Sequence, residues 1–285
     1  MFVVGGSASQ LLSKELAKCL KAKLAKVEVK RFPDDECYVR IHDDLDGKDV
    51  FVVQTTWPDK NIVELFLLQD AVHEFDVSTV TTVVPYFGYA RQDKQFEKGE
   101  PISARAIARL IQNQTDAFLT VDIHATNIID WFDEVSAKNV NAYPEIGKFL
   151  KGLGVQVVLS PDEGRWENAK RVADIVNCEA DFLVKERIDG ETVQMAPKKL
   201  DVNDKTVAIV DDIIATGGTI AKAAEQLRKH GAARIFAACT HGVFAKDGLN
   251  KLRTVCDAIY STDTIENPTT SLTVAPQIAR LALDM

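Results

Sequence analysis

The chain has 285 residues, which at about 150 residues per domain predicts two domains. Hydrophobic residues make up 46% and charged residues 27% of the sequence, and this balance excludes a wholly disordered chain. The formal net charge of −8 argues against a protein that coats nucleic acid or binds anionic membranes. Local binding of phosphate remains open, because backbone amides and a few cations suffice for it.

The cysteines are odd in number and scattered, without a C-x-x-C pair. They are Cys19, Cys37, Cys178, Cys239 and Cys256. This pattern predicts neither a disulfide framework nor a thiolate zinc site, and it favours the reducing cytoplasm. No apolar run approaches the ~18 residues of a membrane span. The start of the chain also lacks the basic segment and long apolar run of a signal peptide, so we expect a cytoplasmic protein.

Short β-branched runs alternate with helical patterns along the chain. In chain order we expect a helix at 10–23, a strand at 50–54, a helix at 61–74, strands at 79–85 and 118–123 flanking a helix at 102–112, a strand at 155–160, a helix at 163–176, a strand at 206–210, a helix at 219–230 and a strand at 234–240. The strands are nearly continuous apolar stretches, which is typical of parallel sheets covered on both faces. The alternation predicts doubly wound α/β domains.

The boundary between the two domains is not marked by a linker rich in glycine, serine or proline. The best candidate is the polar stretch 139–144, which ends in a proline able to open a helix. We therefore expect domains at 1–143 and 144–285, each the size of one α/β domain. An amphipathic helix within 275–285 can pack back on the first domain.

Polar residues follow several of the expected strands. They are Arg91, Gln92 and Asp93 after the second strand, Asp122 and His124 after the third, Asp162 after the fourth, and Asp211 and Asp212 after the fifth. Ligands of open α/β sheets bind beyond the carboxyl ends of the strands. Charged residues there cost desolvation and add no packing, so they indicate a site rather than a fold requirement.

The segment 206–219 gives the sharpest signal. A buried strand leads into Asp211 and Asp212, a loop of small residues follows, and a helix begins. The amides of 216–219 and the helix N-terminus form an anion site, and Gly217 and Gly218 allow a close approach of the backbone. The alternative is a plain strand–loop–helix connection with a threonine N-cap, which the two acids disfavour. The pattern is that of a phosphoribosyl-binding loop and resembles proteins of the phosphoribosyltransferase fold.

Further motifs narrow this resemblance. They are RFPDDE at 31–36, PYFGYARQDK at 85–94 with PISA at 101–104, VDIHA at 121–125, KER at 185–187 and THGVF at 240–244. In this order the chain resembles the ribose-phosphate diphosphokinase (phosphoribosyl diphosphate synthetase) family over nearly its whole length. The resemblance implies two phosphoribosyltransferase-like domains with mainly parallel sheets.

The resemblance also implies a reaction, cofactor and partners. The β,γ-diphosphoryl group of ATP passes to the 1-hydroxyl of ribose 5-phosphate, giving 5-phosphoribosyl 1-diphosphate and AMP for nucleotide biosynthesis. Mg²⁺ is the implied cofactor, and its implied ligands are His124, Asp162 and Asp122. Mg²⁺ takes few protein ligands, and a lone histidine is more often a structural residue bonded to a carbonyl.

The implied ATP-binding residues lie in the first domain. They are Phe32, Asp34, Asp35, Glu36, Arg91 and Gln92. In the family the segment around 32–36 reaches the ATP site of a neighbouring subunit, which implies a homo-oligomer, at least a dimer. Taken alone, 32–35 is an ordinary turn and Arg91 is a surface residue able to pair with Asp93.

The implied catalytic residues are Lys185 and Arg187, two cations on a flexible loop that close over the phosphates. Without the resemblance this segment would be a solvated charged turn, and 186–199 is typical of a mobile hairpin or lid. Arg187 also belongs to the implied ribose 5-phosphate site. The other members of that site are Asp211, Asp212, Ala215, Thr216, Gly217, Gly218 and Thr219.

Two departures from the family pattern stand out. The loop after Asp162 carries Glu163 and Arg165 where small residues are usual, and Ala215 replaces an acid of many relatives.

Two alternative functions are that of a phosphoribosyltransferase and that of a non-catalytic regulatory subunit. A phosphoribosyltransferase needs no ATP motif, so the ATP-side motifs count against it. A regulatory subunit would be expected to lose a catalytic cation or a sugar-binding acid, but the chain keeps Lys185, Arg187, Asp211 and Asp212. The sequence contains neither G-x-x-x-x-G-K-[ST], the phosphate loop of common NTPases, nor G-x-G-x-x-G, the dinucleotide-binding pattern, so it predicts neither of these protein classes.

Overall fold

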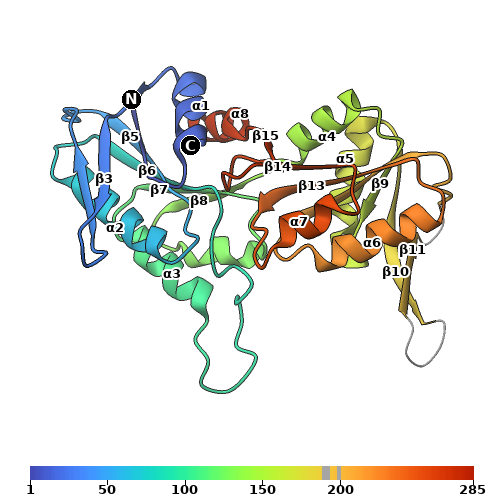
Figure 1. The fold of residues 1–285 in the computed structure, drawn as a ribbon. Helices are drawn as coiled ribbons and strands as arrows, with labels where there is room; N and C mark the ends of the chain where they lie inside the picture. Colours follow the sequence, from blue (N-terminus) through green and yellow to red (C-terminus); the bar gives the residue numbers. More distant parts are fainter. Residues whose placement is uncertain (188–192, 198–199) are drawn as a thin grey trace. The chain divides into compact units, whose positions relative to one another are not determined.

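The computed structural model describes the backbone of residues 1–187, 193–197 and 200–285, and the side chains of this part except those within 184–199. The chain divides into two compact units (Figure 1). The first comprises residues 1–141, 263–266 and 273–285, and the second comprises residues 142–262 and 267–272. Each unit contains one large sheet, and the two units are described in turn.

The first unit contains a six-stranded sheet in which all neighbouring strands are parallel, in the order β2-β1-β5-β6-β7-β8. Its strands are β1 (Phe2–Gly5), β2 (Lys23–Leu24), β5 (Asp49–Val53), β6 (Thr79–Val84), β7 (Ala117–Val121) and β8 (Ser136–Val140). The central strands β1, β5 and β7 are buried over nearly all their residues, which matches their continuous apolar sequences.

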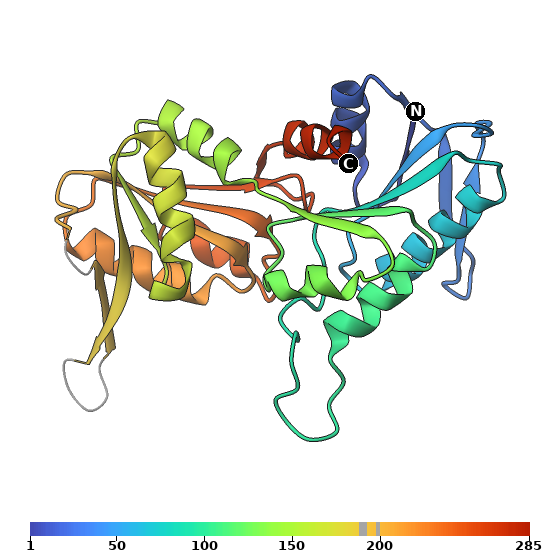
Figure 2. The ribbon, with the colours of Figure 1, turned by 180° about the vertical axis from the view of Figure 1, so that it is seen from behind.

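Helices cover this sheet. They are α1 (Gln10–Leu20), α2 (Lys60–His73), α3 (Ser103–Gln112), the 3-10 helix η1 (Thr126–Trp131) and α8 (Ala275–Leu283). Leu65 of α2 and Ile111 of α3 pack in one core with Val52 of β5 and Phe118 of β7. Helix α8, from the end of the chain, packs beside α1 (Figures 1 and 2) and also contacts β7 and β8. The C-terminal segment thus completes the first unit.

A separate two-stranded sheet belongs to the first unit. Strands β3 (Val27–Arg31) and β4 (Cys37–Ile41) pair antiparallel, with Arg31 opposite Cys37. The residues between them, 32–36, form the connecting turn, in which the Asp35 amide donates to the carbonyl of Phe32 and Asp35 has a φ of 69°. Strand β4 packs against α2, so the turn is presented from the edge of the unit.

The second unit contains a seven-stranded sheet in the order β11-β10-β9-β12-β13-β14-β15. Its strands are β9 (Val157–Ser160), β10 (Glu179–Arg187), β11 (Val193–Pro197), β12 (Thr206–Ile214), β13 (Arg234–Gly242), β14 (Ala258–Thr262) and β15 (Thr270–Leu272). All neighbours are parallel except β10 and β11, which pair antiparallel. This arrangement, with the first sheet, confirms the predicted α/β fold with mainly parallel sheets.

Both faces of the second sheet are buried. The helices are α4 (Tyr143–Gly152), α5 (Trp166–Val176), α6 (Gly218–Lys229) and α7 (Gly248–Arg253). Along β12, Val207 and Ile209 pack in one core with α6 and α7, whereas Ala208 and Val210 pack in another core with α4 and α5. This alternation explains why the strand is a continuous apolar run in the sequence.

Two predicted boundaries are wrong in ways that matter for the site. Strand β12 does not end before the two acids but continues through them to Ile214. The helix expected from residue 163 begins at Trp166, and residues Glu163–Arg165 form a 3-10 turn, η2. The two acids are therefore held in register by the sheet, and a short turn separates β9 from α5.

All five cysteines are free thiols. In the described part of the chain, no helix has both the length and the apolar character that a membrane crossing requires.

Candidate active site

The two acids of β12 differ in exposure. Asp212 is buried, with 5% of its side chain exposed, whereas Asp211 is half-buried. Each carboxylate accepts a hydrogen bond from the amide of the next residue, at 2.9 Å in both cases, from Asp212 to Asp211 and from Ile213 to Asp212. These bonds fix the rotamers of both side chains.

The pKa of Asp211 is raised well above its ordinary value. Burial of the carboxyl group is the main cause, and the hydrogen bond and the negative charge of Asp212 add to it. The positive charge of Arg165 opposes this rise. A negative charge on Asp211 is therefore unfavourable, and the nearby positive charge of Arg165 stabilises it.

Arg165 forms an ion pair with Asp212. The Nη2 atom of Arg165 lies 2.9 Å from Oδ2 of Asp212, and 23% of the arginine side chain is exposed. Arg165 ends the turn η2 that follows β9, and β9 lies next to β12 in the sheet. The carboxyl ends of neighbouring parallel strands meet at one edge, which brings the two residues together.

The loop after β12 leads into the N-terminus of α6. Gly217 is the N-cap, with a φ of 69°, and the first hydrogen bond of the helix runs from the Ala221 amide to the Gly217 carbonyl at 2.8 Å. The amides before Ala221 have no helix carbonyl one turn earlier to which they can donate, so this end of the helix can bind an anion. Thr216 and Thr219 are exposed beside them.

Helix α7 supports this loop from the other side. A Cβ atom on Gly217 would lie 2.9 Å from Cγ of Leu252 and 3.1 Å from the carbonyl oxygen of Gly248. A Cβ atom on Gly248 would lie 2.9 Å from the backbone carbonyl of Thr216. Close contact between two backbones therefore requires glycine at both positions, and it fixes the path of the loop. The role of Gly248 is not predicted from the sequence, which gives no local signal for it.

The predicted residues around 32–36 lie on the turn between β3 and β4. The ring of Phe32 is 45% exposed and makes an edge contact with Tyr38, with ring centroids 5.8 Å apart. Asp34, Asp35 and Glu36 are all exposed, and Asp34 accepts a hydrogen bond from the Glu36 amide at 3.2 Å. The turn thus presents one aromatic ring and three carboxylates to solvent.

Arg91 and Gln92 lie on the connection between β6 and α3. Arg91 is exposed, and among the described residues it has no ion-pair partner, so a pairing with Asp93 is not observed. Oε1 of Gln92 accepts a hydrogen bond from the Ser103 hydroxyl at 2.8 Å, which ties this loop to the start of α3. The arginine is therefore available to an anionic ligand.

The start of α2 links the hairpin turn to this connection. Nη2 of Arg31, at the end of β3, lies 3.5 Å from the carbonyl of Lys60. The hydroxyl of Tyr89 donates to Oδ1 of Asp59 at 2.8 Å. The structure thus brings the two predicted ATP-side segments to adjacent residues at the start of α2, its N-cap Asp59 and its first residue Lys60, within the first unit.

Asp122 and His124 follow β7 in the first unit. Asp122 is buried, with a φ of 36°, and its amide donates to the Val140 carbonyl at 2.9 Å. The next amide, of Ile123, donates to the side chain of Asn139 at 3.0 Å, and His124 is half-buried. Hydrogen bonds to β8 therefore fix the backbone that carries both candidate ligands.

Asp162, the third predicted metal ligand, belongs to the second unit. Its side chain is exposed just beyond β9, and its carbonyl accepts a hydrogen bond from the Ser160 hydroxyl at 2.7 Å. Within either unit, no three described His, Cys, Asp or Glu side chains lie close enough together to hold a metal ion. The donors offered are single carboxylates and one imidazole.

The predicted catalytic residues lie in strand β10. In its pairing with β11, Lys185 is opposite Met195 and Arg187 is opposite Val193. The side chains of Lys185 and Arg187, and much of the expected lid at 186–199, lie outside the residues that the structure describes.

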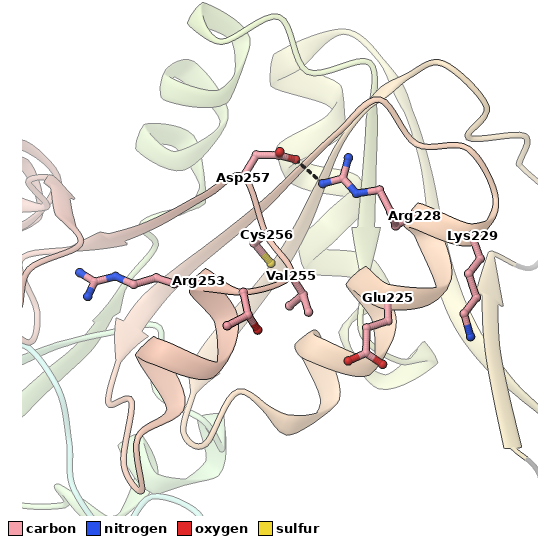
Figure 3. Close-up of a pocket in the computed structure, with 8 residues that line it drawn as sticks. Glu225, Arg228, Lys229, Arg253, Val255, Cys256 and Asp257 are labelled. Atoms are coloured by element: carbon pink, nitrogen blue, oxygen red, sulfur yellow. Dashed lines mark hydrogen bonds and ion pairs between the residues drawn. The ribbon is translucent and has the colours of Figure 1, made fainter.

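A pocket of about 530 Å³ opens elsewhere in the second unit, beyond the C-terminal ends of α6 and α7 (Figure 3). Its lining comprises Glu225, Arg228, Lys229, Arg253, Thr254, Val255, Cys256 and Asp257. Arg228 and Asp257 form an ion pair at 2.6 Å, and burial raises the pKa of the Cys256 thiol to about 12, so this thiol is protonated at neutral pH. None of the predicted site residues lines this pocket.

Comparison with known proteins gives a consistent result over the whole chain. The N-terminal domain of ribose phosphate pyrophosphokinase matches residues 1–114, and the phosphoribosyl transferase domain matches residues 133–272. A ribose-phosphate pyrophosphokinase of Methanopyrus kandleri is 43% identical over 98% of this chain and 97% of its own. One from Pyrococcus furiosus is 39% identical over 99% of this chain and 100% of its own.

A solved structure agrees with these relatives. The phosphoribosylpyrophosphate synthetase of Mycobacterium smegmatis superposes with a TM-score of 0.83 at 29% identity, over 98% of this chain and 96% of its own. Such similarity covers both units. The chain therefore belongs to the ribose-phosphate pyrophosphokinase family.

Proposed function

We propose that this chain performs the reaction of its family, the transfer of the β,γ-diphosphoryl group of ATP to the 1-hydroxyl of ribose 5-phosphate. The products are 5-phosphoribosyl 1-diphosphate, which serves nucleotide biosynthesis, and AMP. The observation that carries this proposal is the end of β12, where two fixed carboxylates lead within a few residues to the N-terminus of α6. A sugar phosphate offers the matching groups, hydroxyls that donate and a phosphate that accepts.

Ribose 5-phosphate binds along this segment in our proposal. Asp211 and Asp212 accept hydrogen bonds from the ribose hydroxyls. The 5-phosphate lies against the backbone and side chains of Ala215, Thr216, Gly217, Gly218 and Thr219. The helix N-terminus and the exposed threonine hydroxyls support this assignment, because they supply donors to phosphate oxygens without a full positive charge.

ATP binds on the first unit in our proposal. The exposed ring of Phe32 stacks on the adenine, and Asp34, Asp35 and Glu36 accept hydrogen bonds from the base and ribose. Arg91 and Gln92 contact the phosphates. The exposed guanidinium of Arg91, which has no ion-pair partner among the described residues, supports its role, because its planar fork matches phosphate oxygens.

Phosphoryl chemistry of this kind depends mainly on positioning and on charge stabilisation. Lys185 and Arg187 supply positive charge to the transferring group, and Arg187 also contacts ribose 5-phosphate. Asp211 and Asp212 hold the sugar so that its 1-hydroxyl faces the β-phosphorus of ATP. The new bond forms between that oxygen and the β-phosphorus, and AMP leaves with the bridging oxygen.

Mg²⁺ fits the donors that the structure offers. His124, Asp122 and Asp162 present carboxylate oxygens and one imidazole, and no dense cluster of ligands. Mg²⁺ normally keeps several waters and takes one or two protein ligands besides the substrate phosphates. When bound, it neutralises phosphate charge and orients the phosphate oxygens.

We further propose a homo-oligomer, at least a dimer, in which the turn at 32–36 lies near a subunit interface. An exposed phenylalanine at the tip of a hairpin supports this. Nucleic acids and membranes are not partners in this proposal. The reaction takes place in the cytoplasm, where free thiols such as the five found here persist.

The test is to incubate the protein with ATP, Mg²⁺ and ribose 5-phosphate and to follow the phosphorus nuclei by ³¹P NMR. We expect AMP and 5-phosphoribosyl 1-diphosphate in equal amounts. Production of ADP would instead mean an ordinary kinase, and the absence of turnover would favour a regulatory subunit.

A further inference from the structure

The ion pair between Arg165 and Asp212 links two segments that lie far apart in the sequence. Arg165 belongs to the turn after β9, and Asp212 belongs to the end of β12. The N–O distance of 2.9 Å is that of a charge-assisted hydrogen bond. Asp212 is a proposed sugar-binding residue, so the arginine acts directly on the sugar site.

The turn that carries Arg165 is anchored on both sides. Before it, the Ser160 hydroxyl donates to the Asp162 carbonyl at 2.7 Å. After it, the indole of Trp166 packs edge-on against Phe182 of β10, with ring centroids 5.9 Å apart. These contacts restrain the backbone that carries Arg165 on both sides of the turn.

Both oxygens of the Asp212 carboxylate are engaged. Oδ1 accepts a hydrogen bond from the Ile213 amide at 2.9 Å, and Oδ2 forms the ion pair with Nη2 of Arg165 at 2.9 Å. The Ile213 amide and the Arg165 guanidinium therefore restrain the plane of the carboxylate and the directions from which a sugar hydroxyl can approach.

The electrical effect of Arg165 reaches both acids. Two adjacent carboxylates repel each other, and burial disfavours their ionised forms. Arg165 supplies the opposing charge for Asp211 as well as the partner for Asp212. Without the arginine, the sugar site would contain two poorly compensated acids.

We propose that Arg165 is a positioning residue for ribose 5-phosphate, which acts by orienting the Asp212 carboxylate toward the vicinal hydroxyls of the sugar. The inference rests on the proposed function, in which Asp211 and Asp212 bind those hydroxyls. It deepens that function by assigning the specificity for a ribose over a deoxyribose to a residue outside the sugar-phosphate loop.

The test compares the unaltered protein with Arg165→Ala and Arg165→Lys. A matched control is Arg253→Gln, which removes a positive charge from the same unit at the exposed end of α7, in the lining of the separate pocket. The measurements are kcat and KM for ribose 5-phosphate and for ATP. The competitor is 2-deoxyribose 5-phosphate, and circular dichroism checks the fold of every variant.

We expect Arg165→Ala to raise the KM for ribose 5-phosphate by about tenfold to a hundredfold, the range that follows from losing one hydrogen bond between charged groups. The KM for ATP should change by less than about threefold. The preference for ribose 5-phosphate over 2-deoxyribose 5-phosphate should fall by about tenfold, because it requires an oriented acceptor. Arg165→Lys should recover part of both effects, and Arg253→Gln should change neither.

Other results would overturn the inference. An unchanged KM and sugar preference in folded Arg165→Ala would show that the arginine does not position the sugar. A fall in kcat with both KM values unchanged would place it on the transferring phosphates instead. If Arg165→Ala does not fold, the same criteria apply to Arg165→Lys. Absence of turnover by the unaltered protein would refute the proposed function, whereas a normal reaction with an inert Arg165 would refute only this inference.

Discussion

Asp211 and Asp263 both have pKa values raised by burial, but they lie in different surroundings. Asp211 lies in the sugar site, where Arg165 opposes the effect of burial and Asp212 adds to it. Asp263 lies in the first unit, 3% exposed, where Oδ1 accepts the Val274 amide at 2.9 Å. Burial raises the pKa of Asp263 to about 6. Only Asp211 has a place in the proposed reaction. A substitution at Asp263 therefore tests how a buried carboxyl group affects stability, without altering the proposed sugar site.

We predict that Asp263→Asn stabilises the protein at about pH 7.5 and not at about pH 4.5. The folded protein holds the proton of Asp263 more tightly than the unfolded chain, so stability falls as the pH rises from about 4 to about 6 and is constant above that. A shift of about two pKa units corresponds to about 3 kcal/mol. Asparagine keeps the acceptor for Val274 without the charge.

Urea unfolding of both proteins at the two pH values measures this difference. A gain in stability that is equal at both values would contradict the prediction, because it would arise from packing and not from ionisation.

At the scale of elements, the connection from β12 to α6 depends on Gly217. Its φ of 69° lies in the left-handed region, and an added Cβ would press on Leu252 and on the carbonyl of Gly248. We predict that Gly217→Ala lowers the free energy of unfolding by about 1–3 kcal/mol. It should also raise the KM for ribose 5-phosphate more than the KM for ATP, because the phosphate loop is displaced.

The matched control is Gly152→Ala at the end of α4. A Cβ atom there meets nothing within 4 Å, and the residue is exposed. Thermal unfolding and steady-state kinetics of both variants measure the effect. Equal midpoints and equal KM values for the two variants would show that the turn tolerates a side chain.

The periodicity of the sequence predicted the buried elements well. The strand expected from 79 to 85 is β6 (Thr79–Val84), and the helix expected from 219 is α6, which begins at Gly218. The hairpin β3–β4 and the edge strands β2 and β15 were not predicted, and neither were β1, β8, β10, β11 and β14. The hairpin strands, β2 and β15 are short and largely half-buried or exposed, so their residues carry no continuous apolar pattern.

The end of β12 shows what a local pattern cannot reveal. The sequence predicts that Asp211 and Asp212 follow the strand, because its apolar run ends at Val210. They lie inside the strand, and an ion pair with Arg165, 47 residues earlier in the chain, offsets the cost of burying the Asp212 carboxylate. The motif identified the acids and the loop, but only the neighbouring positions of β9 and β12 in the sheet bring the arginine to them.

For the whole molecule, the two units carry different parts of the proposed reaction. The first has the ATP-side turn, Arg91 and the residues after β7, and the second has the sugar site and the strand with Lys185 and Arg187. The phosphate loop is built largely from backbone amides and hydroxyls. The net charge of −8 is therefore compatible with two phosphate-bearing substrates, since the proposed function assigns several of the acids to the sugar and the metal.

The proposed metal ligands are Asp122 and His124 of the first unit and Asp162 of the second, and dependence on Mg²⁺ tests this assignment. We predict that chelation with EDTA abolishes formation of 5-phosphoribosyl 1-diphosphate and that excess Mg²⁺ restores it, because uncompensated phosphates repel each other. Asp162→Asn should raise the Mg²⁺ concentration that gives half-maximal rate by about tenfold or more.

The control for that variant is Asp174→Asn, which removes the same charge from an exposed position on α5 of the same unit. It should leave the Mg²⁺ requirement unchanged, because a surface carboxylate in water contributes little to a bound ion at a distance. An equal Mg²⁺ requirement in Asp162→Asn and Asp174→Asn would remove Asp162 from the metal site. His124 and Asp122 would then remain as the only proposed protein ligands, and the metal would depend on residues of the first unit alone.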